Sequence, residues 1–246
     1  MLRRLRSAVA LLVLVVATLV LGGLIWLMSL GRRRPRSAFR LSRLWARLIL
    51  AACGVRLVVE GRERIEPATP YVYISNHQSA LDIPVLMRAL PGHFGFLAKR
   101  ELFHIFFFGK VMELTGQIPV DRDEEVTAIR SMREGARALQ SGSVVVFPEG
   151  TRSPTEQMLP FKGGGFLLAR NAGRPIVPVA ILGTQRILHP RRPLSLGPAG
   201  TVRVVIGQPI ASREGRPAEK MAEVRRSIEE VLKQPGPGAL GSRHMA

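Results

Sequence analysis

The sequence predicts an α/β protein with a mixed central sheet flanked by helices and an N-terminal membrane-associated helical segment. Short runs of β-branched and aromatic residues alternate with stretches in which apolar residues recur every three or four positions. The 246 residues suffice for one sizeable domain and an appendage. Residues 7–31 contain no charged side chain and are rich in leucine and valine, which supplies the membrane segment.

The individual elements follow from these local patterns. We expect strands over residues 55–60, 70–74, 94–98, 143–147, 176–181 and 201–206, with a further strand end at 116–122. Helices are expected over 38–53, from Asp82 to near Pro91, from Asp123 to near Gly142, and over 218–232. Pro178 indicates an edge strand or a bulge, because proline lacks the N–H group that a central strand uses.

Composition divides the chain into three parts. Residues 1–53 are expected to form membrane-associated helices, residues 54–234 an α/β domain, and the Pro/Gly-rich residues 235–246 a disordered tail. Arginines flank the apolar run on both sides, which argues against a cleaved signal peptide. They weakly favour a cell-membrane protein whose C-terminal domain faces the cytoplasm, and a segment that enters only one leaflet fits them as well.

Residues 38–53 carry a second membrane signal. One helix face carries Leu41, Leu44, Trp45, Leu48, Ile49 and Ala52, and arginines occupy the other side. This composition is typical of a helix lying in the lipid headgroup layer, with a core helix of the domain as the alternative.

The net charge of +18 implies an anionic partner: an anionic membrane, a phosphorylated substrate or nucleic acid. A nucleic-acid binder is disfavoured, because the sequence shows no helix-turn-helix, zinc-finger or RNP pattern. Much of the arginine excess also lies beside the membrane segments. The single cysteine, Cys53, excludes an internal disulfide and any multi-cysteine metal site.

His77 stands on the turn between an expected strand and an expected helix, with Asp82 in the first helical turn. A histidine oriented by a carboxylate is a general base, because the carboxylate fixes its tautomer and stabilises the imidazolium. Asp82 also fits a capping box with Ser79, which would make it a structural residue only. A metal site is disfavoured, because no second nearby histidine or cysteine completes a ligand set.

Other strand ends carry cations, a glutamate and a glycine: Lys99, Arg122, Glu149, Gly150 and Arg152. Loops at one edge of a sheet converge on one crevice. A general base beside several cations suits deprotonation of a hydroxyl on a phosphate-bearing lipid. No Gly-x-Ser-x-Gly elbow supplies a covalent nucleophile, although Ser79 and Ser153 keep a membrane-bound esterase open as an alternative.

Four sequence blocks occur in order that together resemble the glycerolipid acyltransferase family, most closely its bacterial 1-acylglycerol-3-phosphate acyltransferases. They are Asn76-His77-Gln78-Ser79-Ala80-Leu81-Asp82, Gly116-Gln117-Ile118-Pro119-Val120-Asp121-Arg122, Phe147-Pro148-Glu149-Gly150-Thr151-Arg152-Ser153 and Val177-Pro178-Val179. The resemblance covers residues 55 to about 210.

The resemblance implies that His77 is the general base for the acceptor hydroxyl and that Asp82 orients it. The donor would be acyl-CoA or an acyl carrier protein, with no metal or organic cofactor. The acceptor would be 1-acylglycerol-3-phosphate, with another lyso-lipid or glycerol-3-phosphate as alternatives. Arg122, Glu149, Gly150 and Arg152 would bind the glycerol-phosphate head. Oxyanion donors would come from N–H groups near Gly150, from Lys99 or from Arg122.

Overall fold

The computed structural model describes residues 2–30, 36–120 and 142–234, and its centre is a seven-stranded sheet in the order β1-β7-β6-β2-β5-β3-β4. The strands are β1 (Val55–Glu60), β2 (Val72–Ser75), β3 (Phe94–Lys99), β4 (Ile118–Val120), β5 (Ser143–Val146), β6 (Ile176–Leu182) and β7 (Gly200–Ile206). Every neighbouring pair is parallel except β6 with β7, so the sheet is mixed as predicted.

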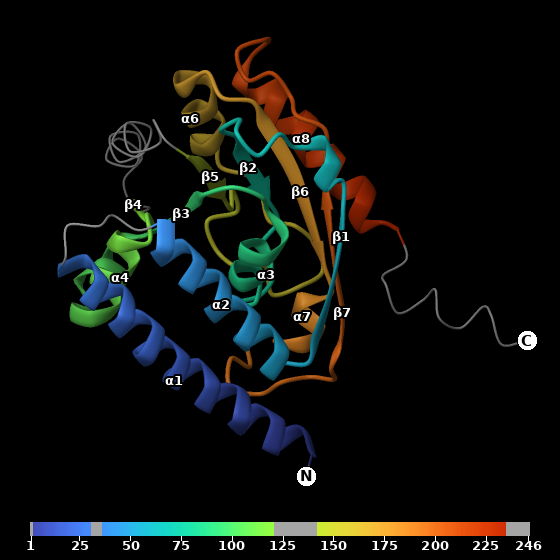
Figure 1. Ribbon diagram of the computed structural model, residues 1–246. Helices are drawn as coiled ribbons and strands as arrows, with labels where there is room; N and C mark the ends of the chain where they lie inside the picture. The colour runs from blue at the N-terminus through green and yellow to red at the C-terminus, as the bar shows by residue number, and fades with distance from the viewer. Residues whose placement is uncertain (1, 31–35, 121–141, 235–246) are drawn as a thin grey trace, which may run out of the picture.

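Helices cover both faces of the sheet (Figure 1). They are α1 (Leu2–Leu30), α2 (Arg36–Ala52), α3 (Asp82–Ala89), α4 (Phe106–Leu114), α6 (Gly164–Ala172), α7 (Thr184–Ile187) and α8 (Pro217–Leu232), with single 3₁₀ turns η1 (Arg62–Arg64) and η2 (Arg100–His104). The expected helix from Asp123 to Gly142 and the tail 235–246 lie wholly or almost wholly outside the described residues. The α/β fold class is confirmed.

The central strands separate two apolar cores. In β5, Val145 faces the core under α2 and α3, while Val144 and Val146 face the core under α6 and α8. The same alternation runs through β2 and β6, and all seven residues of β6 are buried. Strands buried on both faces lack the polar alternation of a half-exposed sheet, and their sequences are therefore continuous apolar runs.

The prediction that Pro178 marks an edge strand or a bulge is wrong. β6 lies between β7 and β2, and Pro178 pairs in register with Ile74. The carbonyl of Pro178 accepts the Gly207 N–H at 2.8 Å, just beyond the end of β7. The N–H and C=O of a strand residue point to the same side of the strand. The N–H that Pro178 lacks would therefore face Gly207, where the pairing of β6 with β7 ends, and its loss there disrupts little of the ladder.

The helix α2 packs against the α/β domain more than the sequence indicated. Phe39, Ala46 and Leu50 enter the core that also contains α3, whereas Leu44 and Leu48 stay exposed. Ile49, which lies on the predicted apolar face, is buried in the same core, and Trp45 and Ala52 pack against it, as the core-helix alternative predicts. The division at residue 53 stays a prediction.

The helix α1 lies along α2 and α4 (Figure 1). It is long and apolar enough to cross a membrane by length and composition, and a large share of its leucines and valines is exposed. Trp45 of α2 donates a hydrogen bond from Nε1 to Thr18 Oγ1 at 3.0 Å, which ties the two helices together.

Candidate active site

The site begins where β2 ends, at a buried asparagine. Asn76 Nδ2 donates to the Ile181 carbonyl at 2.9 Å, and Asn76 Oδ1 accepts the Ile181 N–H at 2.8 Å. The side chain thereby extends the pairing of β2 with β6 by one rung. This pair of hydrogen bonds fixes the direction in which the chain leaves the sheet and positions the next residue, His77.

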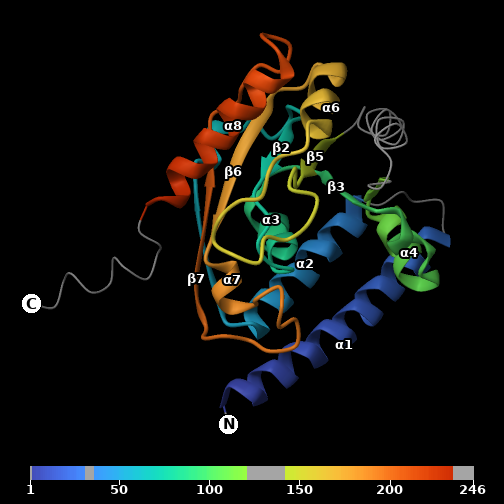
Figure 2. The same cartoon turned by 180° about the vertical axis from the view of Figure 1, so that it is seen from behind.

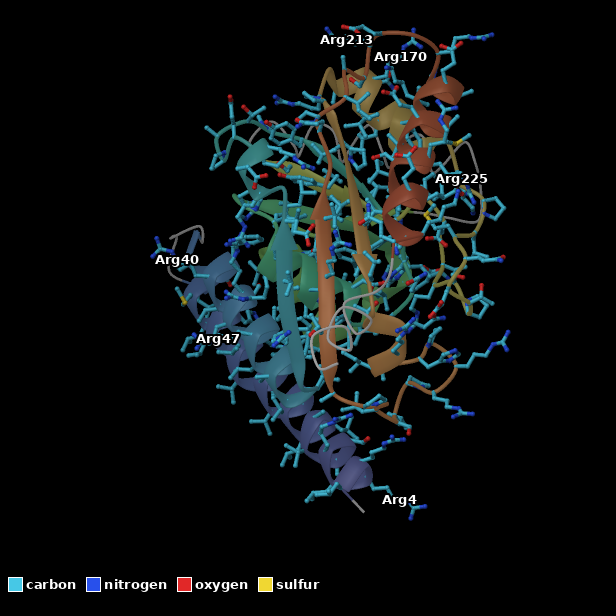
Figure 3. All side chains as sticks on the ribbon, turned by 90° about the vertical axis from the view of Figure 1, so that its right-hand side faces the viewer. Arg4, Arg40, Arg47, Arg170, Arg213 and Arg225 are labelled. Carbon is cyan, nitrogen blue, oxygen red and sulfur yellow. The ribbon has the colours of Figure 1, made fainter. Side chains whose placement is uncertain are left out.

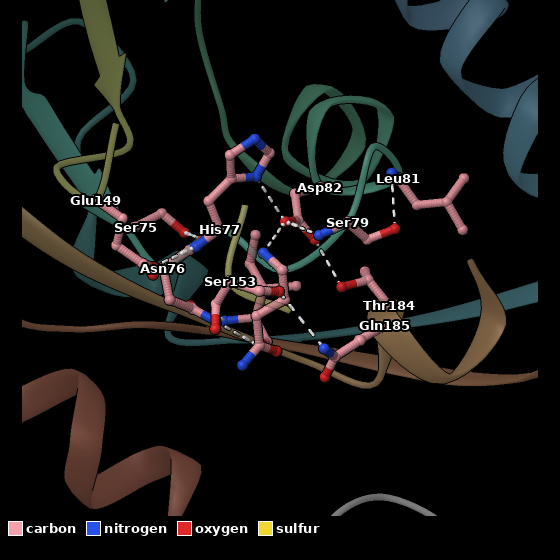
Figure 4. Close-up of polar contacts among 12 residues, drawn as sticks. Ser75, Asn76, His77, Ser79, Leu81, Asp82, Glu149, Ser153, Thr184 and Gln185 are labelled. Carbon is pink, nitrogen blue, oxygen red and sulfur yellow. Dashed lines mark hydrogen bonds and ion pairs between the residues drawn. The ribbon is translucent and has the colours of Figure 1, made fainter. Parts of the chain in front are cut away.

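His77 and Asp82 form the pair that the sequence predicted. His77 Nδ1 lies 2.8 Å from Asp82 Oδ2, and the other ring nitrogen points away from the carboxylate (Figure 4). With Nδ1 as the donor, Nε2 carries a lone pair and can accept a proton. Among the residues that the structure describes, Nε2 has no hydrogen-bond partner. The geometry is that of an oriented general base.

Asp82 is completely buried and accepts four hydrogen bonds. Oδ2 accepts from His77 Nδ1 and from the backbone N–H groups of Gln78 and Ser79 at 2.7 and 2.8 Å. Oδ1 accepts from Thr184 Oγ1 at 2.6 Å. The bond from the Ser79 N–H is the one that the predicted capping box would make, but α3 begins at Asp82 with Leu81 as its N-cap and has no side-chain cap hydrogen bond. Asp82 therefore holds the turn before α3 as well as the His77 ring. Thr184, at the start of α7, was not foreseen.

The ring of His77 lies flat against Phe147, with 4.0 Å between ring centroids and 15° between planes. Phe147 stacks in turn on Phe96 of β3. On its backbone side, His77 accepts a hydrogen bond at its carbonyl from Ser153 N–H at 2.8 Å. The imidazole is thus held on its face, at its edge and through its backbone.

Glu149 connects the two loops that the sequence placed at one sheet edge. Its Oε1 accepts the His77 N–H and its Oε2 accepts the Leu159 N–H, each at 2.8 Å. Burial raises the pKa of Glu149, against the opposing effect of these two bonds. Both oxygens are engaged with backbone, so the geometry supports a positioning role. Direct contact with the head group stays a prediction.

The loop after β5 crosses beside α3 and α7 (Figure 2), where Ser153 N–H bonds the His77 carbonyl. Gly150 in this loop has φ +74°, a conformation that favours glycine. A Cβ built there would lie 3.3 Å from Cε of Lys162, an exposed residue with its own N–H bonded to Pro148 O. Arg152 is also exposed. These cations flank the loop that holds His77.

Lys99 and Arg122 are the two remaining cations that the sequence placed at the site. Lys99 ends β3, where Nζ pairs with Glu101 at 2.8 Å, and it is in register with Val120 of β4. Arg122 follows two positions later and lies outside the described residues. Since β2, β3, β4 and β5 are parallel, Lys99 lies at the same edge of the sheet as the His77 loop.

Comparison with known proteins decides the family. A sequence profile described as "Acyltransferase" matches residues 56–182, about half of the chain. The chain belongs to the acyltransferase family. The resemblance derived from its four sequence blocks is confirmed.

The relatives of this acyltransferase are named for one activity. The chain is 46% identical over 134 residues to "1-acyl-sn-glycerol-3-phosphate acyltransferase alpha" of Ovis aries, covering 54% of this chain and 47% of that protein. It is 37% identical over 191 residues to the Pseudomonas aeruginosa 1-acyl-sn-glycerol-3-phosphate acyltransferase, covering 76% of this chain and 70% of that one. The chain spans about half the length of the mammalian relatives at 45–46% identity.

The fold agrees with a solved structure of such an enzyme. The crystal structure of the 1-acyl-sn-glycerophosphate (LPA) acyltransferase PlsC from Thermotoga maritima superposes with a TM-score of 0.79 at 25% identity. The match covers 98% of both chains, which includes the N-terminal helices as well as the sheet.

The serines of the esterase alternative are poorly placed for nucleophilic attack in this acyltransferase. Ser79 Oγ donates to Leu188 O at 2.7 Å, and Ser153 Oγ donates to Gln157 O at 2.6 Å. Both residues are completely buried, and within the described residues neither hydroxyl is hydrogen-bonded to the His77 ring. Within the described residues, no group of three His, Cys, Asp or Glu side chains is placed to hold a metal ion.

An apolar cavity of about 220 Å³ lies close to the dyad. Ile83 and Phe96 line it, which are respectively the residue after Asp82 and the residue stacked on Phe147. The apolar cluster at residues 102–108, which follows β3, contributes Leu102 and Phe108 to the wall of the cavity, while Phe106 of that cluster is 81% exposed. The cluster therefore has both a lining face and an outward face.

Proposed function

We propose that this acyltransferase transfers an acyl group from an acyl thioester to the free hydroxyl of 1-acylglycerol-3-phosphate, which yields phosphatidic acid. The observation that carries the proposal is the 2.8 Å contact between His77 Nδ1 and a fully buried Asp82. The activity of the relatives supports the acceptor, since the Ovis aries and Pseudomonas aeruginosa proteins are both 1-acyl-sn-glycerol-3-phosphate acyltransferases.

His77 Nε2 takes the proton of the acceptor hydroxyl while the hydroxyl oxygen attacks the thioester carbonyl carbon. A carbon–oxygen bond forms, and the carbonyl oxygen becomes an oxyanion. When the intermediate collapses, the carbon–sulfur bond breaks and the imidazolium returns its proton to the leaving thiolate. Asp82 holds the ring in the required tautomer throughout and stabilises the imidazolium. The protein needs no covalent acyl intermediate in this scheme.

The phosphate of the acceptor is proposed to bind beside the loop after β5, where Arg152 and Lys162 are exposed. A guanidinium suits a phosphate because its N–H groups match two oxygens at once. Lys99, at the end of β3, and Arg122 are proposed to complete the cationic side. Gly150 permits the backbone turn that brings Lys162 close.

One contact reduces the set of candidate hydrogen-bond donors for the oxyanion. The Gly150 N–H donates to the Phe147 carbonyl at 3.1 Å, so this amide is engaged within its own turn. Lys99 and Arg122 are the remaining candidates from the sequence, and we propose that one of them donates to the oxyanion.

The apolar cavity beside Phe96 is proposed to hold a fatty acyl chain, because its lining is almost entirely hydrocarbon and reaches the residue after Asp82. The lyso-lipid acceptor resides in a membrane, and the exposed leucines of α1 together with Phe106 supply a lipid-facing surface. We propose a cell-membrane location with the α/β domain on the cytoplasmic side, where acyl-CoA and acyl carrier protein are available.

The test is acyl transfer by the purified full chain, with acyl-CoA and acyl carrier protein offered separately. Acceptors are lysophosphatidic acid, glycerol-3-phosphate and lyso-ornithine lipid. We expect turnover with lysophosphatidic acid, loss of turnover in His77→Ala, and unchanged turnover in His104→Ala, a matched change at an exposed histidine of η2.

Three outcomes contradict parts of the proposal. Full activity of folded His77→Ala removes the base assignment. Turnover only with lyso-ornithine lipid or glycerol-3-phosphate keeps the mechanism and replaces the acceptor. Thioester hydrolysis without transfer to any acceptor, lost in His77→Ala, indicates an esterase.

A further inference from the structure

A second, strongly cationic pocket lies away from the catalytic dyad. It has a volume of about 850 Å³ and lies between the N-terminal turns of α1 and the segment 188–197 that follows α7. Its cationic lining consists of Arg3, Arg4, Arg186, Arg191 and Arg192, with His189 beside them. No aspartate or glutamate lines it, and neither His77 nor Asp82 does.

The walls of the pocket are held together by specific bonds. Ser7 Oγ of α1 accepts the Leu196 N–H at 3.0 Å, and the Arg6 guanidinium donates to the Gly197 carbonyl. Leu188 and Leu196 form an isolated antiparallel bridge that closes the segment into a loop. The arginines therefore converge because α1 and this loop are joined to each other.

The positive charge of the pocket is poorly balanced. Arg186 pairs with Glu156 at 3.2 Å, and both side chains are mostly exposed, so this ion pair is weak. Within the described ranges, Arg3, Arg4, Arg191 and Arg192 form no ion pair. Like charges brought together repel one another, and a bound anion relieves that repulsion.

An apolar cavity of about 200 Å³ adjoins the cationic pocket. The two share Ser7, Leu11, Leu194 and Leu196 in their walls. The cavity continues inward between α1, α2 and α3, and Leu194 at the boundary is 73% exposed. A cationic mouth that leads into a hydrocarbon-lined cavity matches an amphiphile with an anionic head.

We propose that this composite pocket binds one anionic phospholipid, with its phosphate among Arg3, Arg4, Arg191 and Arg192 and the upper part of a chain in the adjoining cavity. A lipid is favoured over a water-soluble phosphate because the pocket adjoins α1, which exposes leucines along much of its length. The lipid is neither the acceptor nor the product, since the dyad does not line either cavity.

The site has a direct connection to the catalytic loops. Ser79 Oγ donates to Leu188 O, at the start of the pocket loop, and Thr184 of the preceding α7 donates to Asp82. A lipid that orders segment 188–197 therefore also supports the residues that hold Asp82.

The experiment measures lipid binding by the full chain in nonionic detergent micelles, in the His77→Ala background so that binding is independent of turnover. The probe is dioctanoyl phosphatidylglycerol, and dioctanoyl phosphatidylcholine is the neutral comparison. The pocket variant is Arg191→Gln with Arg192→Gln. The matched control is Arg170→Gln with Arg213→Gln, two exposed arginines at the opposite end of the molecule from Arg4 (Figure 3).

We expect saturable binding of phosphatidylglycerol that is weaker by about 30-fold in the pocket variant and unchanged in the control, from the usual contribution of an arginine at an anionic surface. Equal weakening in both variants overturns the proposal in favour of general electrostatic attraction. Unchanged phosphatidylglycerol binding in the pocket variant, with loss of coenzyme A binding, assigns the pocket to the donor instead. Circular dichroism and the thermal unfolding midpoint check that both variants are folded.

Discussion

Asp82→Asn tests whether the buried charge or only the shape of this side chain supports catalysis. The asparagine can keep its oxygen at the Oδ2 position, where it accepts from His77, Gln78 and Ser79. Its NH₂ group then faces Thr184 Oγ1, and that hydroxyl can rotate from donor to acceptor. Every hydrogen bond survives this change, while the negative charge is removed.

The structure therefore predicts a small effect on folding and a large one on rate. Four charge-assisted bonds become neutral and weaken, but the burial cost of the carboxylate also disappears, which leaves a net loss of about 2 kcal/mol in unfolding free energy. The imidazolium that forms in the transition state loses its counter-charge. General-base assistance is worth roughly 10²–10⁴-fold, so kcat is expected to fall by a factor in that range.

The assay is steady-state acyl transfer to lysophosphatidic acid together with urea unfolding in the same detergent. Thr184→Val is the matched control, because it removes one bond to Asp82 and keeps the charge. It is expected to cost about 1–3 kcal/mol of stability and to lower kcat far less than Asp82→Asn does. A folded Asp82→Asn enzyme with kcat within tenfold of the native value would refute the charge argument.

Two further predictions concern the loop after β5. Gly150→Ala forces a side chain into φ +74° and against Lys162, so we expect a loss of about 1–2 kcal/mol in urea unfolding and a raised KM for the acceptor. An unchanged KM would separate Lys162 from the phosphate. Glu149→Gln places an NH₂ group against the N–H of His77 or Leu159, which costs about 1–3 kcal/mol at neutral pH. Burial raises the pKa of Glu149 above 4.5, so native stability should fall as pH rises from 4.5 to that raised pKa, because the unfolded chain releases the proton first. The Gln variant lacks this fall, and unfolding curves across that window measure the difference.

The elements of the fold could be predicted because their signals are local. A run such as residues 176–181 identifies a buried strand without knowledge of its neighbours. The strand order could not be predicted, since the antiparallel pairing of β6 with β7 depends on contacts between segments distant in sequence. Pro178 shows the consequence: its position in the ladder, and not its identity, determines whether the missing N–H matters.

The same limit applies to the site. His77 and Asp82 are five residues apart, and a turn followed by a helix suffices to bring them together. The groups that hold them are distant: Thr184 is 102 residues from Asp82, and Ile181 is 105 residues from Asn76. The Phe147–Ser153 block identified Glu149 as a candidate site residue. The hydrogen bond from the His77 N–H to Glu149 could not be predicted, because it forms only when β2 and β5 lie side by side.

These distant contacts explain why a buried carboxylate is tolerated at the edge of the sheet. Burying Asp82 and Asn76 without partners would cost several kcal/mol each, yet each is held by paired donors and acceptors from β6 or α7. The network is therefore stable only when β6, α7 and the His77 loop are all in place. The orientation of the His77 ring is thus linked to completion of the fold. This arrangement suits the role proposed for His77, because a base whose tautomer is fixed by the fold does not have to be assembled by the substrate.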